Sequence, residues 1–193
     1  SKKYLNFPFF KKKSRQLNII NVARFTDQKD HLTLLKAVNL LKNKINIRLL
    51  IVGRGTNKIK MLNFVNENKL QKIVKIINFQ NNPYKYIDKS NLFILSSKFE
   101  GLPNVLLEAI TLKKFIISSN CPTGPREILM NGKGGGLFKV GDYQALSQKI
   151  MTFYNSKNKF KKKIDYSFKS LHRFDYYLNL KKYLNVVKRL TDN

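Results

Sequence analysis

The sequence predicts an α/β protein built on a doubly wound parallel sheet of the Rossmann type. Short runs of apolar, mostly β-branched residues recur at intervals of roughly 20 to 25 residues, with helix-like segments between them. Each run is continuously apolar, which is typical of parallel strands covered on both faces. A chain of 193 residues is long enough to bury a core as one domain. Such sheets bind ligands at the carboxyl ends of their strands.

Five strands and five helices are expected to alternate along this part of the chain. The strands are expected at residues 16–23, 45–53, 72–79, 91–97 and 114–120. The helices that follow them are expected at residues 26–42, 56–69, 81–90, 103–112 and 124–132. The strand runs are short, whereas the helical segments carry apolar residues at a spacing of three to four, and this difference separates the two types of element.

Capping residues and apolar spacing define the first two helices. Thr26 or Asp27 is expected to cap the first, because a side-chain oxygen there can accept a hydrogen bond from an unpaired N–H group. Its apolar residues recur at helical spacing as Leu32, Leu35, Val38 and Leu41. In the second helix, Ile59, Leu62 and the pair 64–65 are expected to face inward.

Proline and glycine mark the ends of the later helices. Pro83 and Pro103 each suit the first helical turn, since proline lacks the N–H group that would be unpaired there. Gly132 is expected to close the fifth helix. These signals place the fourth helix directly after the fourth strand and its short loop.

The chain is expected to divide into three parts. Residues 1–15 are interpreted as a linker, 16–155 as the Rossmann-like domain, and 156–193 as a basic connector followed by a C-terminal helix. A further amphipathic helix is expected at 141–155. The terminal helix, at 174–190, carries an apolar stripe of Tyr177, Leu180, Tyr183, Leu184 and Val187. We expect this stripe to dock on the parent fold, with membrane contact as the alternative.

The charge of the chain narrows its partners without deciding its function. With 38 Lys plus Arg against 11 Asp plus Glu, the formal net charge is +27. Such a balance favours nucleic acid, acidic lipid headgroups or phosphorylated substrates as partners. A biased coding composition rich in Lys, Asn and Ile explains the same charge equally well.

Cellular location is inferred from the absence of export signals and disulfides. The single cysteine, Cys121, excludes an internal disulfide or a cysteine-based metal site and is expected to be a buried thiol. No apolar run is long enough for a transmembrane helix, and the N-terminal segment lacks the features of a signal peptide. A cytoplasmic setting is expected. The chain begins with Ser, which suggests a piece of a longer protein.

Several familiar motifs are absent. The segment that starts at Gly53 has Lys58 where a dinucleotide fingerprint needs glycine, and "NGKGGG" lacks the spacing of a phosphate-binding P-loop. No Asp-x-Asp pair offers ligands for a divalent metal, and His31 and His172 have no zinc-like spacing. His31 is expected on a solvated helix face. Ser96–Ser97 lie outside a nucleophile-elbow motif, which argues against a serine hydrolase.

The stretch "SSKFEGLPNVLLEAI", residues 96–110, combines two carboxylates with a helix start. Glu100 lies in the loop after the fourth strand, and Glu108 lies about a turn and a half into the next helix. The N–H groups expected to be unpaired between them belong to Gly101, Leu102, Asn104 and Val105. A helix start attracts a phosphate, while carboxylates accept hydrogen bonds from vicinal hydroxyls. The pattern predicts a ligand with a polyol on each side of a phosphate, such as a nucleotide sugar.

Two cations follow the first strand. Arg24 lies at its end and Lys29 lies in the first turn of the next helix. In a doubly wound sheet the first and fourth strands both lie near the centre, so both cations can reach the same crevice. The alternative is that they are two ordinary members of a basic surface.

Four segments together resemble a known family. They are "VARFTDQKD", "LLIVGRG", "NPYKYIDKSNLFILSSKFEGLPNVLLEAI" and "SSNCPTGPREILMNGKGGGLFKVGDYQAL". Their order and spacing resemble the C-terminal, nucleotide-sugar-binding domain of a GT-B fold retaining glycosyltransferase of family four, with its Glu-x7-Glu motif. Ala23 stands where glycine is usual in that family. The similarity covers roughly residues 17–150.

The resemblance implies a role for each site residue. Arg24 and Lys29 would hold the donor diphosphate, Glu100 would contact the donor sugar, and Glu108 would accept hydrogen bonds from the ribose. Sugar and phosphate would be bound by residues 101–104, through the amides of Gly101, Leu102 and Asn104 at the turn that Pro103 forms. The base would lie near Gly53 and Phe79, with uridine favoured by the family. Neither a metal nor a cofactor is implied.

The resemblance also implies that half of the enzyme is missing. GT-B enzymes have two domains, and the N-terminal one carries most of the acceptor site. Transfer of a sugar, with retention, to a glycan or lipid-linked acceptor in cell-surface polysaccharide synthesis is therefore expected only with a partner domain. Peripheral contact with an anionic membrane would suit such an acceptor. Two alternatives remain open: a non-catalytic nucleic-acid-binding module, and a natural split half that needs a partner chain.

Overall fold

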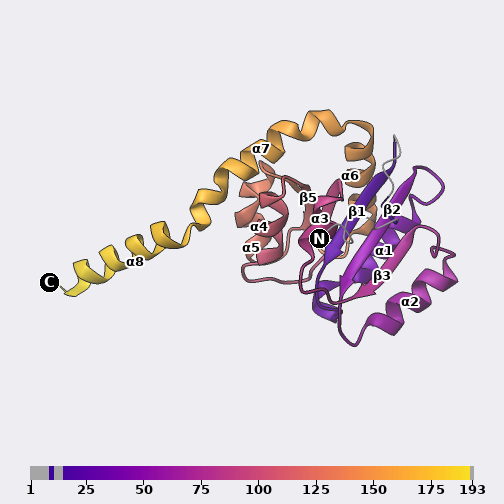
Figure 1. Ribbon diagram of the computed structural model, residues 1–193, viewed down its shortest axis with the longest axis horizontal. Helices are drawn as coiled ribbons and strands as arrows, with labels where there is room; N and C mark the ends of the chain where they lie inside the picture. Colours follow the sequence, from indigo (N-terminus) through magenta and orange to yellow (C-terminus); the bar gives the residue numbers. More distant parts are fainter. Residues whose placement is uncertain (1–8, 11–14, 192–193) are drawn as a thin grey trace, which may run out of the picture.

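The computed structural model describes residues 9–10 and 15–191, which form a parallel sheet covered by helices (Figure 1). The sheet has six strands in the order β3-β2-β1-β4-β5-β6, and every pairing in it is parallel. The strands are β1 Leu17–Val22, β2 Ile47–Gly53, β3 Val74–Asn78, β4 Leu92–Leu95, β5 Phe115–Ser119 and β6 Gly136–Phe138. The predicted doubly wound α/β fold is confirmed, and the strand order reverses between β1 and β4.

The helices occupy the connections between strands and the C-terminal part of the chain. They are α1 His31–Asn39, α2 Lys58–Glu67, α3 Tyr84–Asp88, α4 Asn104–Thr111, α5 Gly124–Ile128, α6 Tyr143–Asn155, α7 Lys161–Lys169 and α8 Tyr176–Thr191. Short 3-10 turns are η2 Asp27–Lys29, η3 Met130–Gly132, η4 Lys157–Phe160 and η5 Ser170–Phe174.

Two apolar clusters cover the two faces of the sheet. On one face, side chains of α1, α2 and α6 pack against alternate strand residues such as Ile19. On the other face, α3, α4 and α5 pack against the intervening residues, such as Ile20. Because both faces are covered, the strands can be apolar at consecutive positions, as the sequence pattern indicated.

The sixth strand was missed in the sequence. β6 pairs with β5 from Gly136 to Phe138, where the sequence predicted no strand. It has only three residues and begins in a run of glycines, so it lacks the β-branched apolar run that identifies the other strands. Gly135 approaches the sheet closely, since a Cβ atom there would lie 2.9 Å from the carbonyl oxygen of Ile116.

Several helix details differ from the predictions. Neither Thr26 nor Asp27 caps α1: a 3-10 turn intervenes, and Asp30 caps the helix by accepting from the N–H of Thr33. Pro83 and Pro103 are the N-cap residues of α3 and α4 rather than their first helical residues.

The prediction of which α2 residues face inward was also wrong in part. Ile59 is 71% exposed and Leu62 is 38% exposed, while Met61 and Val65 are buried. The helix begins two residues later than the pattern suggested, at Lys58, so its face is set by tertiary packing rather than by the count of apolar residues.

The expected connector contains a helix that packs on the domain. Ser167 on α7 is buried and its hydroxyl donates to the carbonyl of Gly134, while Lys113 after α4 lies over the ring of Phe168. The predicted linker lies mostly outside the described residues. Phe10 is described, and it is buried in the cluster that also holds α3 and α4.

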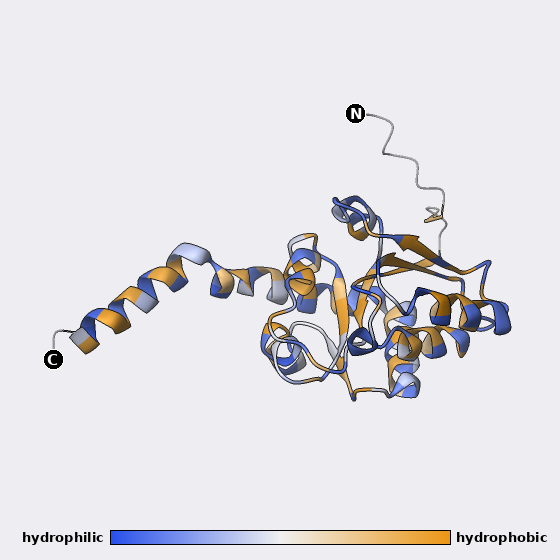
Figure 2. Ribbon diagram, turned by 90° about the horizontal axis from the view of Figure 1, so that it is seen from below, coloured by the Kyte–Doolittle hydropathy of each residue, from blue (hydrophilic) through white to orange (hydrophobic). Residues whose placement is uncertain are grey.

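Helix α8 extends away from the sheet (Figure 1). None of its residues is buried, and its stripe is exposed: Tyr177 76%, Leu180 38%, Tyr183 66%, Leu184 50% and Val187 37%. Hydrophobic and hydrophilic residues alternate along it (Figure 2). The stripe does not dock on the part of this domain that the structure describes, so the expected docking on the parent fold stays a prediction for the domain that the resemblance implies is missing. No described helix is long and apolar enough to cross a membrane.

Candidate functional site

A pocket of about 430 Å³ lies at the carboxyl ends of the central strands. Because all strands are parallel, the loops that follow β1, β2 and β3 meet at this edge, and α4 forms a further wall. The lining residues are Val22, Ala23, Arg24, Val52, Gly53, Arg54, Phe79, Gln80, Asn81, Pro83, Tyr84, Val105 and Glu108. The pocket therefore brings together four residues predicted from the sequence: Arg24, Gly53, Phe79 and Glu108.

The charged groups in the pocket are one carboxylate and two guanidinium groups. Arg24 is exposed, and Glu108 is half-buried on the second turn of α4. Burial raises the pKa of the Glu108 carboxyl, and neither recorded ion pair of the described residues neutralises it. A carboxylate without a cation, in a pocket with room for a ligand, is suited to accept hydrogen bonds from hydroxyl groups.

The pocket rim carries an aromatic ring beside a cation. The guanidinium carbon of Arg54 lies 5.1 Å from the centre of the Phe79 ring, and Phe79 is 53% exposed. Both follow strand ends, at β2 and β3. Gly53 is required here by close approach, since a Cβ atom at this position would lie 1.9 Å from the carbonyl oxygen of Ala23. Tyr84 was not singled out from the sequence, although its position just after the β3 loop is a signal that could have found it.

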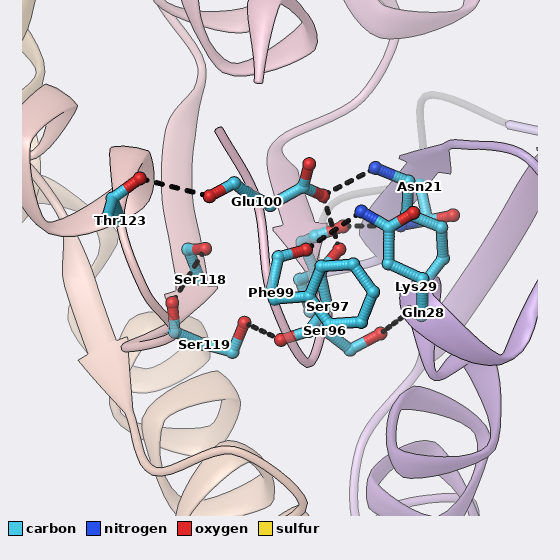
Figure 3. Close-up of polar contacts among 11 residues, drawn as sticks. Asn21, Gln28, Lys29, Ser96, Ser97, Phe99, Glu100, Ser118, Ser119 and Thr123 are labelled. Carbon is cyan, nitrogen blue, oxygen red and sulfur yellow. Dashed lines mark hydrogen bonds and ion pairs between the residues drawn. The ribbon is translucent and has the colours of Figure 1, made fainter. Parts of the chain in front are cut away.

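Lys29 and Glu100 form an ion pair that does not line this pocket. The Lys29 Nζ lies 2.6 Å from Glu100 Oε1, and the side chains are only 14% and 6% exposed. The hydroxyl of Ser97 donates to the same Glu100 oxygen at 2.6 Å (Figure 3). The sequence predicted that Arg24 and Lys29 reach the same crevice. In the structure Arg24 lines the pocket, whereas Lys29 is held by Glu100 outside it, a pairing that the sequence did not predict.

The turn after β1 is fastened to the loop after β4 (Figure 3). The hydroxyl of Ser96 donates to the carbonyl of Lys29 at 3.0 Å, and the N–H of Lys98 donates to the carbonyl of Gln28 at 2.7 Å. The Gln28 amide returns a hydrogen bond to the carbonyl of Phe99 at 2.9 Å. These contacts fix the position of the Lys29 and Glu100 backbones relative to each other, and they give Ser96 and Ser97 structural roles.

The loop after β5 supports Glu100 from the other side. The N–H of Glu100 donates to the carbonyl of Pro122, and the N–H of Thr123 donates to the carbonyl of Glu100, both at 2.8 Å. Gly124 allows this approach, because a Cβ atom there would lie 1.9 Å from the carbonyl oxygen of Gly101. Three loops, after β1, β4 and β5, thus hold one carboxylate in place.

The start of α4 offers unpaired amides, as predicted. Within the described residues, no hydrogen bond is formed by the N–H groups of Gly101, Leu102, Asn104 and Val105. Gly101, Leu102 and Asn104 are exposed, while Pro103 is buried. A Cβ atom on Gly101 would meet nothing within 4 Å, so the space beside this residue is open. Together with the helix dipole, this end of α4 attracts an anion.

His31 was wrongly expected on a solvated face. It is 3% exposed, and its ring lies edge-on to Phe25 with the centroids 5.4 Å apart. Burial, together with the nearby charge of Lys29, lowers its pKa to about 4. The ring is therefore neutral at pH 7. The sequence predicted a helix from residue 26, whereas α1 begins at His31, so the predicted helix face did not apply to this residue.

Two further predictions from the sequence concern the thiol of Cys121 and the binding of a metal ion. Cys121 is buried, as predicted, and burial raises the pKa of its thiol, which makes it a poor nucleophile. Among the described residues, no cluster of three or more His, Cys, Asp or Glu could hold a metal ion. The cationic side chains that line the pocket are those of Arg24 and Arg54.

Comparison with known proteins decides the family. The sequence profile described as "Glycosyl transferases group 1" matches residues 4–170 of the chain. The chain belongs to this family of glycosyltransferases. The GT-B relationship inferred from the four segments is thereby supported at the level of the family and the fold.

Two curated relatives and one solved structure illustrate the similarity. The chain is 41% identical over 111 residues to the uncharacterized glycosyltransferase MJ1059 of Methanocaldococcus jannaschii, covering 57% of this chain and 27% of that protein. It is 32% identical over 134 residues to a Campylobacter jejuni protein, covering 69% of this chain and 36% of that protein. That protein is the N-acetylgalactosamine-N,N'-diacetylbacillosaminyl-diphospho-undecaprenol 4-alpha-N-acetylgalactosaminyltransferase.

The fold similarity extends over nearly the whole domain. HepE of Anabaena, solved in complex with UDP, matches with a TM-score of 0.82 at 18% identity, covering 91% of this glycosyltransferase chain and 49% of HepE. At that identity the match shows the fold. The chain spans only about a quarter to a third of the length of the two curated relatives.

Proposed function

We propose that the chain is the donor-binding half of a retaining glycosyltransferase that uses a nucleoside-diphosphate sugar. The observation that carries this proposal is the pocket at the strand ends, which is lined by Arg24, Glu108 and Val105, the last of these being one of the α4 residues with an unpaired N–H group. In the sequence, a carboxylate on each side of an anion-attracting helix start matches the order of ribose, diphosphate and sugar.

Each part of the donor has a matching surface. The diphosphate lies at the start of α4, where the amides of Gly101 and Asn104 and the side chains of Arg24 and Lys29 supply positive potential. The ribose hydroxyls donate to Glu108. The base lies against the backbone at Gly53 and the exposed ring of Phe79.

Catalysis in this proposal is mainly electrostatic. When the bond between sugar and phosphate breaks, negative charge builds up on the leaving diphosphate, and fixed amides and cations stabilise it. Arg24 and Lys29 provide these charges, so the reaction needs neither a metal nor another cofactor. Glu100, held at the loop tip beyond β4, contacts the hydroxyls of the transferred sugar. Retention of configuration is assigned from the Glu-x7-Glu pattern.

UDP is the proposed nucleotide, supported by the fold similarity to HepE, whose structure contains it. A glycan or lipid-linked acceptor in cell-surface polysaccharide synthesis is supported by relatives such as the Campylobacter transferase named for a diphospho-undecaprenol substrate. The acceptor site and full activity require the N-terminal domain, in the same chain or in a partner. The exposed stripe of α8 is available for that contact, and the basic surface suits a cytoplasmic, peripheral position on an anionic membrane.

Calorimetric titration with UDP, GDP, ADP and dTDP tests the proposal. We expect at least one nucleotide to bind, and Arg24→Ala to weaken its binding about tenfold, since a charge-assisted contact to phosphate is lost. Lys72→Ala is the matched control, because this exposed lysine precedes β3 and so lies at the amino ends of the strands, whereas the pocket lies at their carboxyl ends. It should leave the affinity unchanged.

The same titration separates the proposal from non-specific attraction to a basic protein. If Arg24→Ala and Lys72→Ala weaken binding equally, and affinity falls steeply with salt for every polyanion, the charge-driven alternative is favoured. If none of the four nucleotides binds, the donor-binding function is rejected.

A further inference from the structure

Within the part of the chain that the structure describes, the recorded side-chain contacts hold the Glu100 carboxylate through one of its oxygens. Both Lys29 and Ser97 donate to Oε1, each at 2.6 Å, and neither contact uses Oε2 (Figure 3). The side chain is 6% exposed, so solvent contributes little to stabilising its charge. The position of this carboxylate therefore depends on two donors of different kinds, one charged and one neutral.

Lys29, which donates to Glu100, has a second anionic partner when the nucleotide sugar binds. In the proposed function, which this inference rests on, the donor diphosphate attracts the Lys29 ammonium group. A largely buried carboxylate that loses its cation is strongly destabilised unless other hydrogen bonds remain. When Lys29 turns towards the phosphate, the Ser97 hydroxyl is the donor left on Glu100 Oε1.

Ser97 is fixed independently of Lys29. It is fully buried at the end of β4, and its carbonyl accepts a hydrogen bond from the hydroxyl of Ser119 on β5 at 2.6 Å. Ser97 lies in the loop two residues after β4, and its backbone is tied to β5 by this bond, whereas Lys29 belongs to a 3-10 turn and reaches Glu100 by a long, flexible side chain. Motion of the lysine side chain need not disturb the serine.

We propose that Ser97 is a positioning residue: it keeps the Glu100 carboxylate in place when Lys29 exchanges this partner for the donor diphosphate. After the diphosphate binds, the Ser97 hydroxyl still holds Oε1 of Glu100. Oε2 of the same carboxylate then stays oriented to accept from the sugar hydroxyls. Ser97 does not touch the donor itself. Its effect on nucleotide binding passes through Glu100, and this dependence is what distinguishes it from a serine that merely satisfies its own hydroxyl in the core.

A double-mutant cycle with UDP measures that dependence. Affinities are determined by calorimetry for the wild-type chain, Ser97→Ala, Glu100→Ala and the double variant. Without the hydroxyl, release of Lys29 leaves Oε1 unpaired, so Ser97→Ala should weaken UDP binding about tenfold. In the Glu100→Ala background the same substitution should change the affinity less than about twofold, because there is no carboxylate to hold.

Two variants guard against a general structural effect. Ser118→Ala removes another fully buried hydroxyl, on β5, which donates to the carbonyl of Ser119 and does not contact Glu100. It should leave UDP affinity unchanged in both backgrounds. Ser97→Cys keeps the size of the side chain with a weaker donor, and it should give an intermediate loss.

The outcomes separate the two levels of the argument. An equal loss from Ser97→Ala in both backgrounds, or no loss in either, overturns the positioning role while the donor site stands. Absence of binding by the wild-type chain to UDP and to the other nucleotides rejects the proposed function, and the positioning role falls with it. A loss that requires Glu100 and follows the strength of the donor at residue 97 supports it.

Discussion

At the scale of single residues, the site separates two carboxylates that look equivalent in the sequence. Glu100 is paired with Lys29 and Ser97, whereas neither ion pair recorded among the described residues involves Glu108, and burial raises its pKa. The two glutamates are therefore prepared for different tasks. One is held in a fixed position near the expected sugar, and the other is a strong acceptor left free for a ligand.

The raised pKa of Glu108 gives a prediction for stability. The folded protein binds a proton at Glu108 more tightly than the unfolded chain, so stability decreases as pH rises from the unfolded pKa through the folded one. At pH 7, which is above the unfolded pKa, the raised pKa of Glu108 therefore opposes folding. Glu108→Gln should therefore raise the melting temperature of the ligand-free protein at pH 7, with a gain that disappears below pH about 4.

The same variant should bind nucleotide about tenfold more weakly, since an amide accepts hydrogen bonds less strongly than a carboxylate. Thermal denaturation and calorimetric titration check the two effects. A lower melting temperature at pH 7, or unchanged affinity for UDP, would contradict the assigned role of Glu108. A protein that gains stability while losing affinity would show that the carboxylate is there for the ligand.

Residue identities were predicted better than residue partners. Arg24, Gly53, Phe79 and Glu108 could be found because each lies just after a strand end or on the following helix, and topology brings such positions together. The pairing of Lys29 with Glu100 joins positions 71 residues apart and depends on how two loops approach. The burial of His31 likewise depends on where α1 begins, which the cap signals placed a few residues too early.

At the scale of elements, the loop after β4 is shaped by its neighbours rather than by its own sequence. It is fastened to the turn after β1 by hydrogen bonds, and to the loop after β5 by the paired backbones of Glu100 and Thr123. These contacts fix the loop that leads into α4, where the N–H groups without recorded hydrogen bonds lie. The sequence indicated the helix start, but the supporting loops became visible only in three dimensions.

Gly124 provides a test of this support. In Gly124→Ala the new methyl group would lie 1.9 Å from the carbonyl oxygen of Gly101 and 2.7 Å from Cδ of Pro103, so the loops must separate. We expect a loss of unfolding free energy of about 1–3 kcal/mol, measured by chemical denaturation. Gly101→Ala is the control, because its methyl group would meet nothing within 4 Å. Equal effects of the two substitutions would show that the loop contact is unimportant.

At the scale of the whole molecule, the described residues form a six-stranded sheet that helices cover on both faces, with one helix that packs on neither face. Helix α8 exposes an apolar stripe that no described element covers, and the chain spans about a quarter to a third of the two curated relatives. The fold class could be predicted because continuous apolar strands repeat throughout the sheet. The path of α8 could not, since an amphipathic pattern shows that a partner surface is needed but not where it lies.

The net charge of +27 also belongs to this scale. Among the described residues, the two recorded ion pairs are Lys29–Glu100 and Lys114–Asp88, so acidic side chains neutralise few of the cations. The resulting field attracts every polyanion. Charge alone therefore cannot identify the ligand, and the test of function must report where the ligand lies.

A crystal structure of the chain with UDP tests the central claim most directly. We predict the diphosphate at the start of α4, within hydrogen-bond distance of the amides of Gly101 or Asn104 and of the Arg24 side chain. The ribose should contact Glu108, and the Lys29 ammonium group should have left Glu100 for the phosphate. UDP bound elsewhere on the basic surface, with this pocket empty, would contradict the assignment of a nucleotide-sugar site.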